Sequence, residues 1–515
     1  MPHINHGRAV LICAMFTFLS SPAHAESAQY QEQYAGETPS YWYESGRQEL
    51  KTALAKRQNK KRARNIILFV GDGMGISTVT AGRIYDGQSR GQSGEESRLS
   101  FEAFPAVGLA KTYNTNQQTS DSAGTMTAMM SGIKTEAGFI GVDATAKRGD
   151  CASVATAIAP TFLQQAALAG KATGIVSTAT ITHATPAATY AHVPERNWQS
   201  DADMPAAALA AGCRDIARQL IELNSGGGIN VALGGGISNF LPKEQTDPLS
   251  RSPGARNDGR DLTREWLTSR TDSAFVWNRE QLASVDKKRT RYLLGLFNPS
   301  HLSYSYDRRD QTASEPGLVE MTAAAIDILK EDRDGFFLMV EAGRIDHGHH
   351  YGNALRALGD TQELSLAVQI ALDKTDARDT LIIVTADHSH TFTLAGYPTR
   401  GNPILGKVIA NDASGNPAQQ PAKALDGMPY TTVGYINGPG ALDHTTGTRG
   451  AGRRDLTAID TTAPEFFQEA LVPGYTETHA AEDVPIYAIG PWSHLFHTTH
   501  EQHYIYHVMR HAAGL

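Results

Sequence analysis

The chain has 515 residues, of which 41% are hydrophobic and 19% charged, and its net charge is −8. These fractions are typical of a folded globular protein and exclude a disordered, collagen-like or coiled-coil chain. The acidic balance argues against a protein that coats nucleic acid or anionic lipid, so we expect no nucleic-acid binding. The length predicts one large α/β unit with insertions, or a few domains.

Residues 1–25 have the pattern of a secretory signal peptide. Arg8 supplies the positive charge, an apolar run follows, and Ala25 ends a small-residue cleavage site. The run is too short to span a bilayer, and a buried N-terminal helix is the alternative. The C-terminal end lacks the hydrophobic tail of a lipid-anchor signal. We therefore expect cleavage after Ala25, export to the periplasm or the medium, and no membrane anchor.

Cys151 and Cys213 are the cysteines that remain beyond this predicted signal. In an oxidising compartment an even number of cysteines favours one disulfide, and two buried free thiols are the alternative. A bond between them would close a loop of roughly 60 residues. In the chain-entropy account it would stabilise the fold by about 4 kcal/mol.

Residues 26–64 are polar and end in a basic run, and we interpret them as an N-terminal arm. From residue 65, short apolar runs without polar alternation are typical of parallel strands covered on both faces. These runs lie at 65–70, 174–178, 229–233, 335–340, 380–386 and 484–489, and helical patterns lie at 151–169, 206–223, 316–331 and 351–374. The alternation predicts an α/β fold with a large, mostly parallel central sheet and helices on both faces.

Residues 397–475 break this rhythm. They are rich in Gly, Pro, Asn, Asp and Thr and contain one strand-like piece at 430–436. We interpret them as a small inserted domain. The main α/β domain would then comprise residues 65–396 and its return at 476–515.

Acidic residues and histidines follow three of the predicted strands. In open α/β sheets, ligands bind beyond the carboxyl ends of the strands. Each motif alone is compatible with an ordinary turn, but together they favour a metal centre. Carboxylates with imidazoles suit zinc, and oxygen ligands alone suit magnesium. The residues are Asp72, Glu341, Asp346, His350, Asp387 and His388.

Two further motifs point to phosphate chemistry. Ser122 lies where a small-residue helix is expected to begin, and free N–H groups at a helix start attract anions. A serine there would suit a metal-activated nucleophile, and an N-cap serine is the alternative. Thr185 offers a hard oxygen for magnesium. Arg196 offers a fork for phosphate oxygens, or is a surface residue.

With these residues the chain resembles the alkaline phosphatases, and the animal-type branch more than the enterobacterial type. The matching motifs run in family order: VGDGMG, DSAGTMTAMMSG, THATPAATYAH with RNW, VEAGRIDHGHH, VTADHSH and ETHAAEDV. The resemblance implies metal-dependent hydrolysis of phosphate monoesters at alkaline pH. The reaction would pass through a phosphoserine intermediate and use two zinc ions and one magnesium ion per chain.

The resemblance also implies a role for each residue. Ser122 would be the nucleophile, and Arg196 would bind phosphate. The implied metal ligands are Asp72, Asp387 and His388 for one zinc, Asp346, His350 and His479 for the other, and Asp72, Thr185 and Glu341 for magnesium, with His183 beside it.

Further family traits concern pairing and assembly. Family members pair cysteines like Cys151 and Cys213, and they form homodimers through the N-terminal arm and an inserted crown domain, here residues 397–475. Some carry a fourth site, for calcium. We do not expect a tight calcium site, because Asn298 stands where the family often has an acidic ligand.

Two other classes of function compete with this interpretation. A phosphodiesterase or sulfatase on the same fold is one, but the sequence around Ser122 does not fit the C/S-x-P-x-R pattern of sulfatases. A diester also has fewer anionic oxygens to engage magnesium and Arg196. A non-catalytic exported protein that binds metal or phosphate is the other.

Histidines crowd the C-terminus and lie outside this account. If the segment is helical, four of them would share one face and bind zinc weakly, or they are ordinary surface or interface residues. The six residues are His494, His497, His500, His503, His507 and His511.

Overall fold

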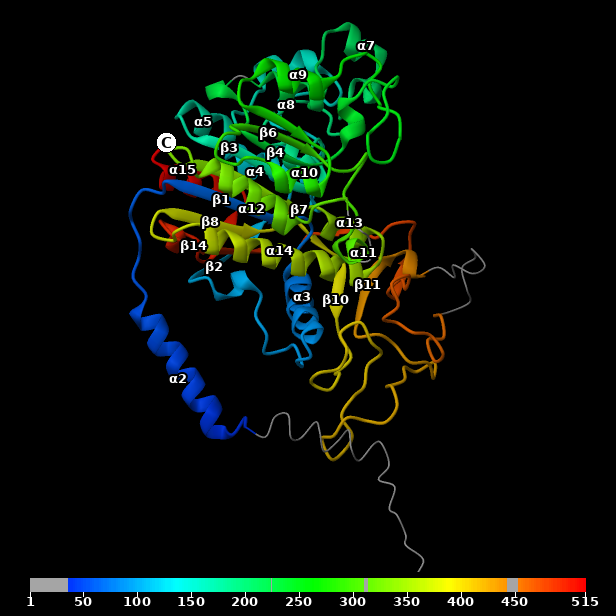
Figure 1. The fold of residues 1–515 in the computed structure, drawn as a ribbon. Coiled ribbons are helices and arrows are strands. Elements are labelled where there is room, and N and C mark those ends of the chain that lie inside the picture. Colours follow the sequence, from blue (N-terminus) through cyan, green and yellow to red (C-terminus); the bar gives the residue numbers. More distant parts are fainter. Residues whose placement is uncertain (1–35, 224, 310–313, 442–452) are drawn as a thin grey trace, which may run out of the picture.

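The computed structural model describes residues 36–223, 225–309, 314–441 and 453–515, so the predicted signal peptide lies outside the described residues. A ten-stranded sheet forms the centre, in the order β15-β2-β14-β8-β1-β7-β3-β4-β6-β5 (Figure 1). Its strands are β1 (Asn65–Gly71), β2 (Ala106–Lys111), β3 (Ala172–Thr180), β4 (Val231–Gly235), β5 (Ser273–Val276), β6 (Tyr292–Leu296), β7 (Phe336–Ala342), β8 (Thr380–Thr385), β14 (Val484–Ile489) and β15 (Thr499–Glu501).

Most neighbouring strands are parallel, as predicted. β1 pairs in parallel with both β7 and β8, which places Phe69 beside Val340 and Val384. The prediction is wrong for β14, which runs antiparallel to β8 and β2. β9 (Ser389–His390) directly follows β8 and pairs with β13 (His479–Ala480), just before β14. The chain therefore re-enters the sheet from the edge at which β8 ends, and the strand direction is reversed.

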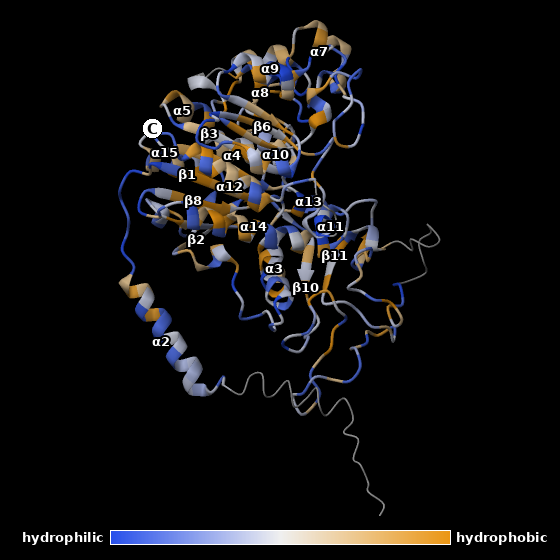
Figure 2. Ribbon diagram, viewed as in Figure 1, coloured by the Kyte–Doolittle hydropathy of each residue, from blue (hydrophilic) through white to orange (hydrophobic). Residues whose placement is uncertain are grey.

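Helices cover both faces of the sheet. Phe337 of β7 meets Phe162 on one face, with ring centroids 4.9 Å apart. The next residue, Leu338, points to the other face and lies with Leu329 beside Gly174. Accordingly α4 (Ser122–Ser131), α5 (Phe162–Leu168) and α15 (Tyr504–Ala513) pack on one face, and α3 (Ile76–Ser89), α12 (Leu318–Leu329) and α14 (Ala354–Lys374) pack on the other. The strands between these layers are coloured mainly as hydrophobic (Figure 2).

Two predicted helices are interrupted. The stretch 151–169 forms a 3₁₀ helix at Cys151–Thr156 and then α5, because Thr161 starts a new helix by accepting from the Gln164 N–H at 3.2 Å. The stretch 206–223 forms α7 (Ala206–Ala210) and α8 (Ile216–Glu222). Gly212 between them has a φ of +79°, a left-handed conformation that ends a helix.

The remaining elements lie around the sheet. They are α2 (Pro39–Ala55), α6 (Ala184–Ala187), α9 (Leu262–Ser269), α10 (Arg279–Ser284), α11 (Ser305–Arg308), α13 (Arg344–His350), and a small sheet of β10 (Phe392–Leu394), β11 (Val433–Gly438) and β12 (Ala470–Pro473). α2 stands apart from the main body, and none of its residues is buried (Figure 1). No helix in the described ranges combines the length and apolar character needed to cross a bilayer.

Candidate metal centre and nucleophile

The carboxyl ends of three adjacent strands bring acidic side chains together. In the register of β1, Val70 lies beside Glu341 of β7 and Thr385 of β8. Asp72 and Asp387 come two residues beyond Val70 and Thr385, so they emerge at the same edge as Glu341. All three carboxylates are fully buried. This edge is the place at which parallel α/β sheets bind ligands.

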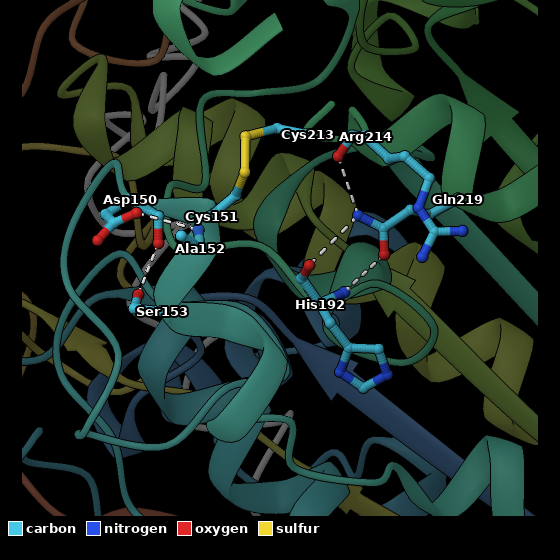
Figure 3. Close-up of a disulfide and its surroundings, with 8 residues drawn as sticks. All are labelled: Asp150, Cys151, Ala152, Ser153, His192, Cys213, Arg214 and Gln219. Carbon is cyan, nitrogen blue, oxygen red and sulfur yellow. Dashed lines mark hydrogen bonds between the residues drawn. A yellow bond between two sulfur atoms is a disulfide. The ribbon is translucent and has the colours of Figure 1, made fainter. Parts of the chain in front are cut away.

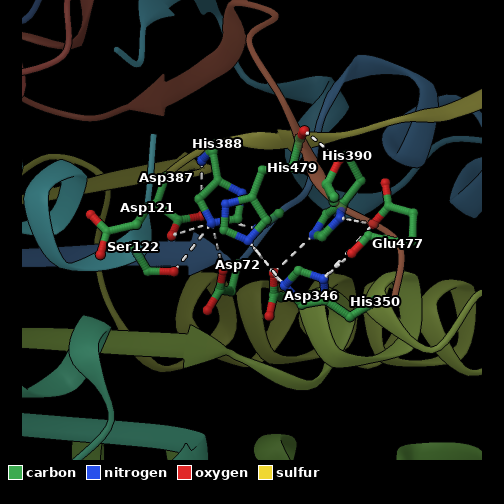
Figure 4. A network of polar contacts seen from close by, with 12 residues as sticks. Asp72, Asp121, Ser122, Asp346, His350, Asp387, His388, His390, Glu477 and His479 are labelled. Carbon is green, nitrogen blue, oxygen red and sulfur yellow. Dashed lines mark hydrogen bonds and ion pairs between the residues drawn. The ribbon is translucent and has the colours of Figure 1, made fainter. Parts of the chain in front are cut away.

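Three adjoining groups of ligand-type atoms occupy this edge, each with atoms within 4.8 Å of one another. α13 carries Asp346 and His350 four residues apart, hence on one helix face. β13 brings His479 to them (Figure 4). The first metal group is Asp346, His350, His390 and His479; the second is Asp72, Asp346 and His388; the third is Asp72, His183 and Glu341.

The first metal group has two imidazole nitrogens that face each other. His350 Nδ1 donates to the backbone oxygen of Glu477 at 2.6 Å, and His479 Nδ1 donates to the backbone oxygen of Ser120 at 2.8 Å. Their Nε2 atoms, only 3.0 Å apart, therefore both present lone pairs in neutral imidazoles. Two lone pairs cannot bond each other. Both nitrogens are instead placed to bind one cation between them. Histidines that bind metals typically donate their other ring N–H to a backbone oxygen, as His350 and His479 do.

Buried polar atoms that make no hydrogen bond within the described residues lie in the second and third metal groups, and also on Thr185 and on Asp387, which adjoins His388. Such atoms are costly unless something compensates them. They belong to residues that the sequence analysis selected as ligands, and hard oxygen atoms suit divalent cations. The atoms are both carboxylate oxygens of Asp72, Oγ1 of Thr185, Oε1 of Glu341 and Oδ2 of Asp387, together with Nδ1 of His183.

The pKa values of the buried carboxylates also favour bound cations. Burial, followed by repulsion from Asp387, raises the pKa of Asp72 well above its usual value. Burial likewise raises the pKa of Glu341 to about 7. For Asp346, burial would raise the pKa, but His350, His390 and His479 outweigh it and hold the pKa well below the usual value. The carboxylates of Asp72 and Glu341 therefore have no positive charge among the described residues close enough to offset their burial. Divalent cations bound beside them would supply that charge.

Ser122 is the first residue of α4, as predicted. Asp121 caps this helix by accepting from the Gly124 N–H at 3.1 Å. Ser122 Oγ lies 3.1 Å from Nε2 of His388 and is thereby attached to the second metal group. Burial, followed by His479, lowers the pKa of His388 well below its usual value, which favours the neutral imidazole. The serine thus has a partner in the metal centre as well as a helix start beside it.

Arg196 faces the same serine through its neighbour Asp121. Its NH1 donates to Asp121 Oδ2 at 3.0 Å, and its NH2 lies 3.2 Å from Nε2 of His183. The side chain is 21% exposed, so the guanidinium reaches solvent at the edge of the metal centre. This position, between the capped serine and the third metal group, suits an anion-binding arginine rather than a surface residue.

Sequence reasoning missed two fully buried residues of the site. His390 contacts Asp346 Oδ1 through Nε2 at 2.8 Å and Glu477 Oε2 through Nδ1 at 2.5 Å. Although burial lowers the pKa of His390, Glu477 and Asp346 outweigh it and raise the pKa to about 10. The sequence marks these two residues by position alone, because His390 lies two residues after His388 and Glu477 lies two residues before His479.

The disulfide predicted between Cys151 and Cys213 is present (Figure 3). Their Cα atoms are 5.8 Å apart, and the bond closes a span of 62 residues. The cysteines pack with Trp198, Met204 and Ala208 in a small apolar cluster. The bond therefore fastens the segment that follows Arg196 to the loop around the 3₁₀ helix.

The C-terminal histidines do not share one helix face, so the helical arrangement that would let four of them bind zinc does not occur. His500 belongs to β15, where it pairs with Ala110 of β2, and His503 precedes α15. Only His507 and His511 lie on the helix, because strand pairing takes the earlier part of the segment. The three metal groups found among the described residues contain none of these histidines.

A mostly parallel sheet that carries three adjoining metal-ligand groups beside a helix-start serine and an arginine defines a metal-dependent hydrolase of phosphate esters. The sequence model of the family "Alkaline phosphatase" matches residues 63–515. The chain belongs to the alkaline phosphatase family, and it is a phosphomonoester hydrolase.

Individual relatives agree with this assignment. The chain is 44% identical to the tissue-nonspecific alkaline phosphatase of Gallus gallus over 92% of this chain and 89% of the relative. It is also 44% identical to an alkaline phosphatase of Gadus morhua over 92% of this chain and 97% of the relative. Among solved structures, the alkaline phosphatase of Thermus thermophilus superposes with a TM-score of 0.62 at 25% identity, covering 90% of this chain and 94% of that chain.

Proposed function

We propose that Ser122 is the nucleophile of this phosphatase and that two zinc ions and one magnesium ion serve it. Asp346, His350 and His479 would hold one zinc. Asp72, Asp387 and His388 would hold the other, and Asp72, Thr185 and Glu341 would hold magnesium, with His183 beside it. When bound, these ions would stabilise negative charge on the phosphate and on the attacking and leaving oxygens, and lower the pKa of the hydroxyl groups they coordinate.

The chain's own residues would carry out two successive displacements at phosphorus. Ser122 Oγ attacks the phosphorus of the monoester, and the P–O bond to the alcohol breaks. A water molecule then attacks the phosphoserine, which restores Ser122 and releases inorganic phosphate. Arg196 binds two phosphate oxygens throughout, and the N–H groups at the start of α4 face the same charge. Two in-line displacements predict retention of configuration at phosphorus.

One observation carries this proposal. The oxygen of Ser122 lies 3.1 Å from His388, whose group also contains the unpartnered oxygens of Asp72. The candidate nucleophile and the candidate metal ligands therefore lie next to each other at the carboxyl edge of the sheet. A phosphodiesterase has less use for Arg196 together with a magnesium group, because a diester offers fewer anionic oxygens.

Trapping the phosphorylated serine tests the nucleophile. The enzyme is mixed with a labelled phosphomonoester and quenched in acid, and the labelled peptide is identified by mass spectrometry. We expect label on Ser122, and loss of both label and most turnover in Ser122→Ala. Ser120→Ala is the matched control, because Ser120 is buried nearby and bonds His479 only through its backbone oxygen. Label on another residue would overturn the assignment.

We also propose that the enzyme is an exported homodimer. The disulfide fits an oxidising compartment. α2 exposes Tyr41, Trp42 and Tyr43 and buries none of its residues, which suits a segment that packs on a second copy. Residues 397–475, which contain β11 and β12, would form the crown at the same interface. Light scattering of the purified protein tests this proposal, and a monomeric mass would contradict it.

A further inference from the structure

The carboxylate of Glu477 lies behind the first metal group, on the segment that leads into β13 (Figure 4). Glu477 is fully buried. Its Oε2 accepts from Nδ1 of His390 at 2.5 Å, and its Oε1 accepts from the N–H of Thr391 at 2.6 Å and from Oγ1 of Thr391 at 2.7 Å. Both oxygens therefore accept from donors at the end of β9, His390 and the residue that follows it, and the carboxylate has a fixed orientation.

Hydrogen bonds link Glu477 to two of the three proposed ligands of this group, and the chain itself leads from Glu477 to the third. Its backbone oxygen accepts from His350 Nδ1 at 2.6 Å, and its N–H donates to the backbone oxygen of His350 at 2.9 Å. Its carboxylate holds His390, whose Nε2 contacts Asp346 Oδ1 at 2.8 Å. His479 follows two residues later, at the start of β13. Glu477 is thus hydrogen-bonded to His350, linked to Asp346 through His390, and two residues from His479 in the chain.

His390 is an intermediary in this arrangement and not a fourth ligand. Both of its ring nitrogens face carboxylate oxygens, Glu477 on one side and Asp346 on the other. A ring engaged on both sides has no lone pair directed at a metal. His350 and His479, by contrast, each use one nitrogen for a backbone oxygen and direct the other into the group.

We propose that Glu477 is a positioning residue that sets the geometry of the zinc site formed by Asp346, His350 and His479, acting on Asp346 through His390. The inference rests on the proposed zinc assignment. Partners behind metal ligands fix ligand orientation, and their loss typically weakens metal affinity by about 10- to 100-fold. The effect should fall on this zinc, because none of the hydrogen bonds of Glu477 within the described residues reaches Asp72, Asp387 or His388, the ligands proposed for the other zinc.

Glu477→Gln is the sharpest perturbation, because it preserves shape and keeps one acceptor oxygen. The amide nitrogen cannot accept a hydrogen bond, so either the Nδ1–H of His390 or the backbone N–H of Thr391 loses its acceptor inside a buried site. Thr391→Val is a milder second variant that removes only one donor to Glu477 and keeps the backbone N–H. It applies the same test if Glu477→Gln does not fold.

The experiment measures zinc release from the purified holoenzyme into a chromogenic chelator. In Glu477→Gln we expect one zinc per chain to leave about 10- to 100-fold faster than in the wild type, with the release of the second zinc unchanged. Thr391→Val should accelerate the same zinc by about 2- to 10-fold. Asp247→Asn is the matched control, because Asp247 is a buried carboxylate that likewise accepts from backbone N–H groups and a hydroxyl, and it should release both ions at wild-type rates.

The outcomes separate this inference from the assignment on which it rests. Wild-type release rates for both zinc ions in Glu477→Gln would overturn the positioning role and leave the zinc assignment intact. Equal acceleration of both ions, or the same acceleration in Asp247→Asn, would also overturn it, because either result marks a general loss of structure. A wild-type protein that binds no zinc when supplied with it would overturn both proposals.

Discussion

Replacing Arg196 with alanine should weaken phosphate binding without disturbing the fold. The NH1 group of Arg196 is engaged by Asp121 and NH2 adjoins His183, but the guanidinium carries further N–H groups for an anion. Loss of two charge-assisted hydrogen bonds costs about 1.5–3 kcal/mol each. Because the side chain is 21% exposed, we use the lower end of that range. The total of about 3 kcal/mol corresponds to a roughly 100-fold higher inhibition constant for phosphate.

The fold should survive this change because Asp121 keeps its other partners. Its carboxylate still accepts from the N–H groups of Gly124 and Gly138 and from the Asn114 amide, so the cap of α4 is preserved. Competitive inhibition by inorganic phosphate gives the constant, elemental analysis checks that metals are retained, and Arg214→Ala controls for the lost charge. An unchanged inhibition constant in metal-replete Arg196→Ala would refute the phosphate-binding role.

Other perturbations have equally defined outcomes. Chelation should abolish activity, and zinc with magnesium should restore it. Burial raises the pKa of Glu341 to about 7 in the folded protein without metal. The metal-stripped protein should therefore lose thermal stability as the pH rises from about 4.5 through 7, whereas the reloaded protein should not. Equal pH profiles of the two forms in scanning calorimetry would contradict this. Reducing the bond between Cys151 and Cys213, which spans 62 residues, should lower the unfolding free energy in urea by about 4 kcal/mol; an unchanged midpoint would count against this estimate. Deleting α2 should halve the mass measured by light scattering, and an undiminished dimer would exclude the arm as the main contact.

The hydrophobic runs were sufficient to predict the strands that build the site. β1, β7 and β8 are fully or almost fully buried, so their side chains are apolar along the whole strand and easily recognised. β2 alternates between buried and partly exposed residues, and β5 has only four residues, mostly half-buried. β5 at one edge of the sheet and β2, next to the other edge, therefore carry a weak signal. The direction of β14 was not predictable from its own residues, because the pairing of β9 with β13 decides it.

The candidate site was predictable as far as its motifs extend. Asp72, Asp346 and His388 carry a signal because each follows a recognisable strand. The helical arrangement that joins Asp346 to His350 was not predicted, since α13 has only seven residues. His390 and Glu477 act through hydrogen bonds to other residues, and such contacts depend on tertiary packing. No spacing in the sequence marks them.

The most direct test of the account is one paired measurement on the purified protein. Elemental analysis gives the metal content per chain, and parallel assays give the hydrolysis rates of a phosphate monoester, a phosphate diester and a sulfate ester. We predict about two zinc ions and one magnesium ion per chain, with a strong preference for the monoester. Full metal loading with a preference for the diester or the sulfate ester would contradict the roles given to Arg196 and the magnesium group.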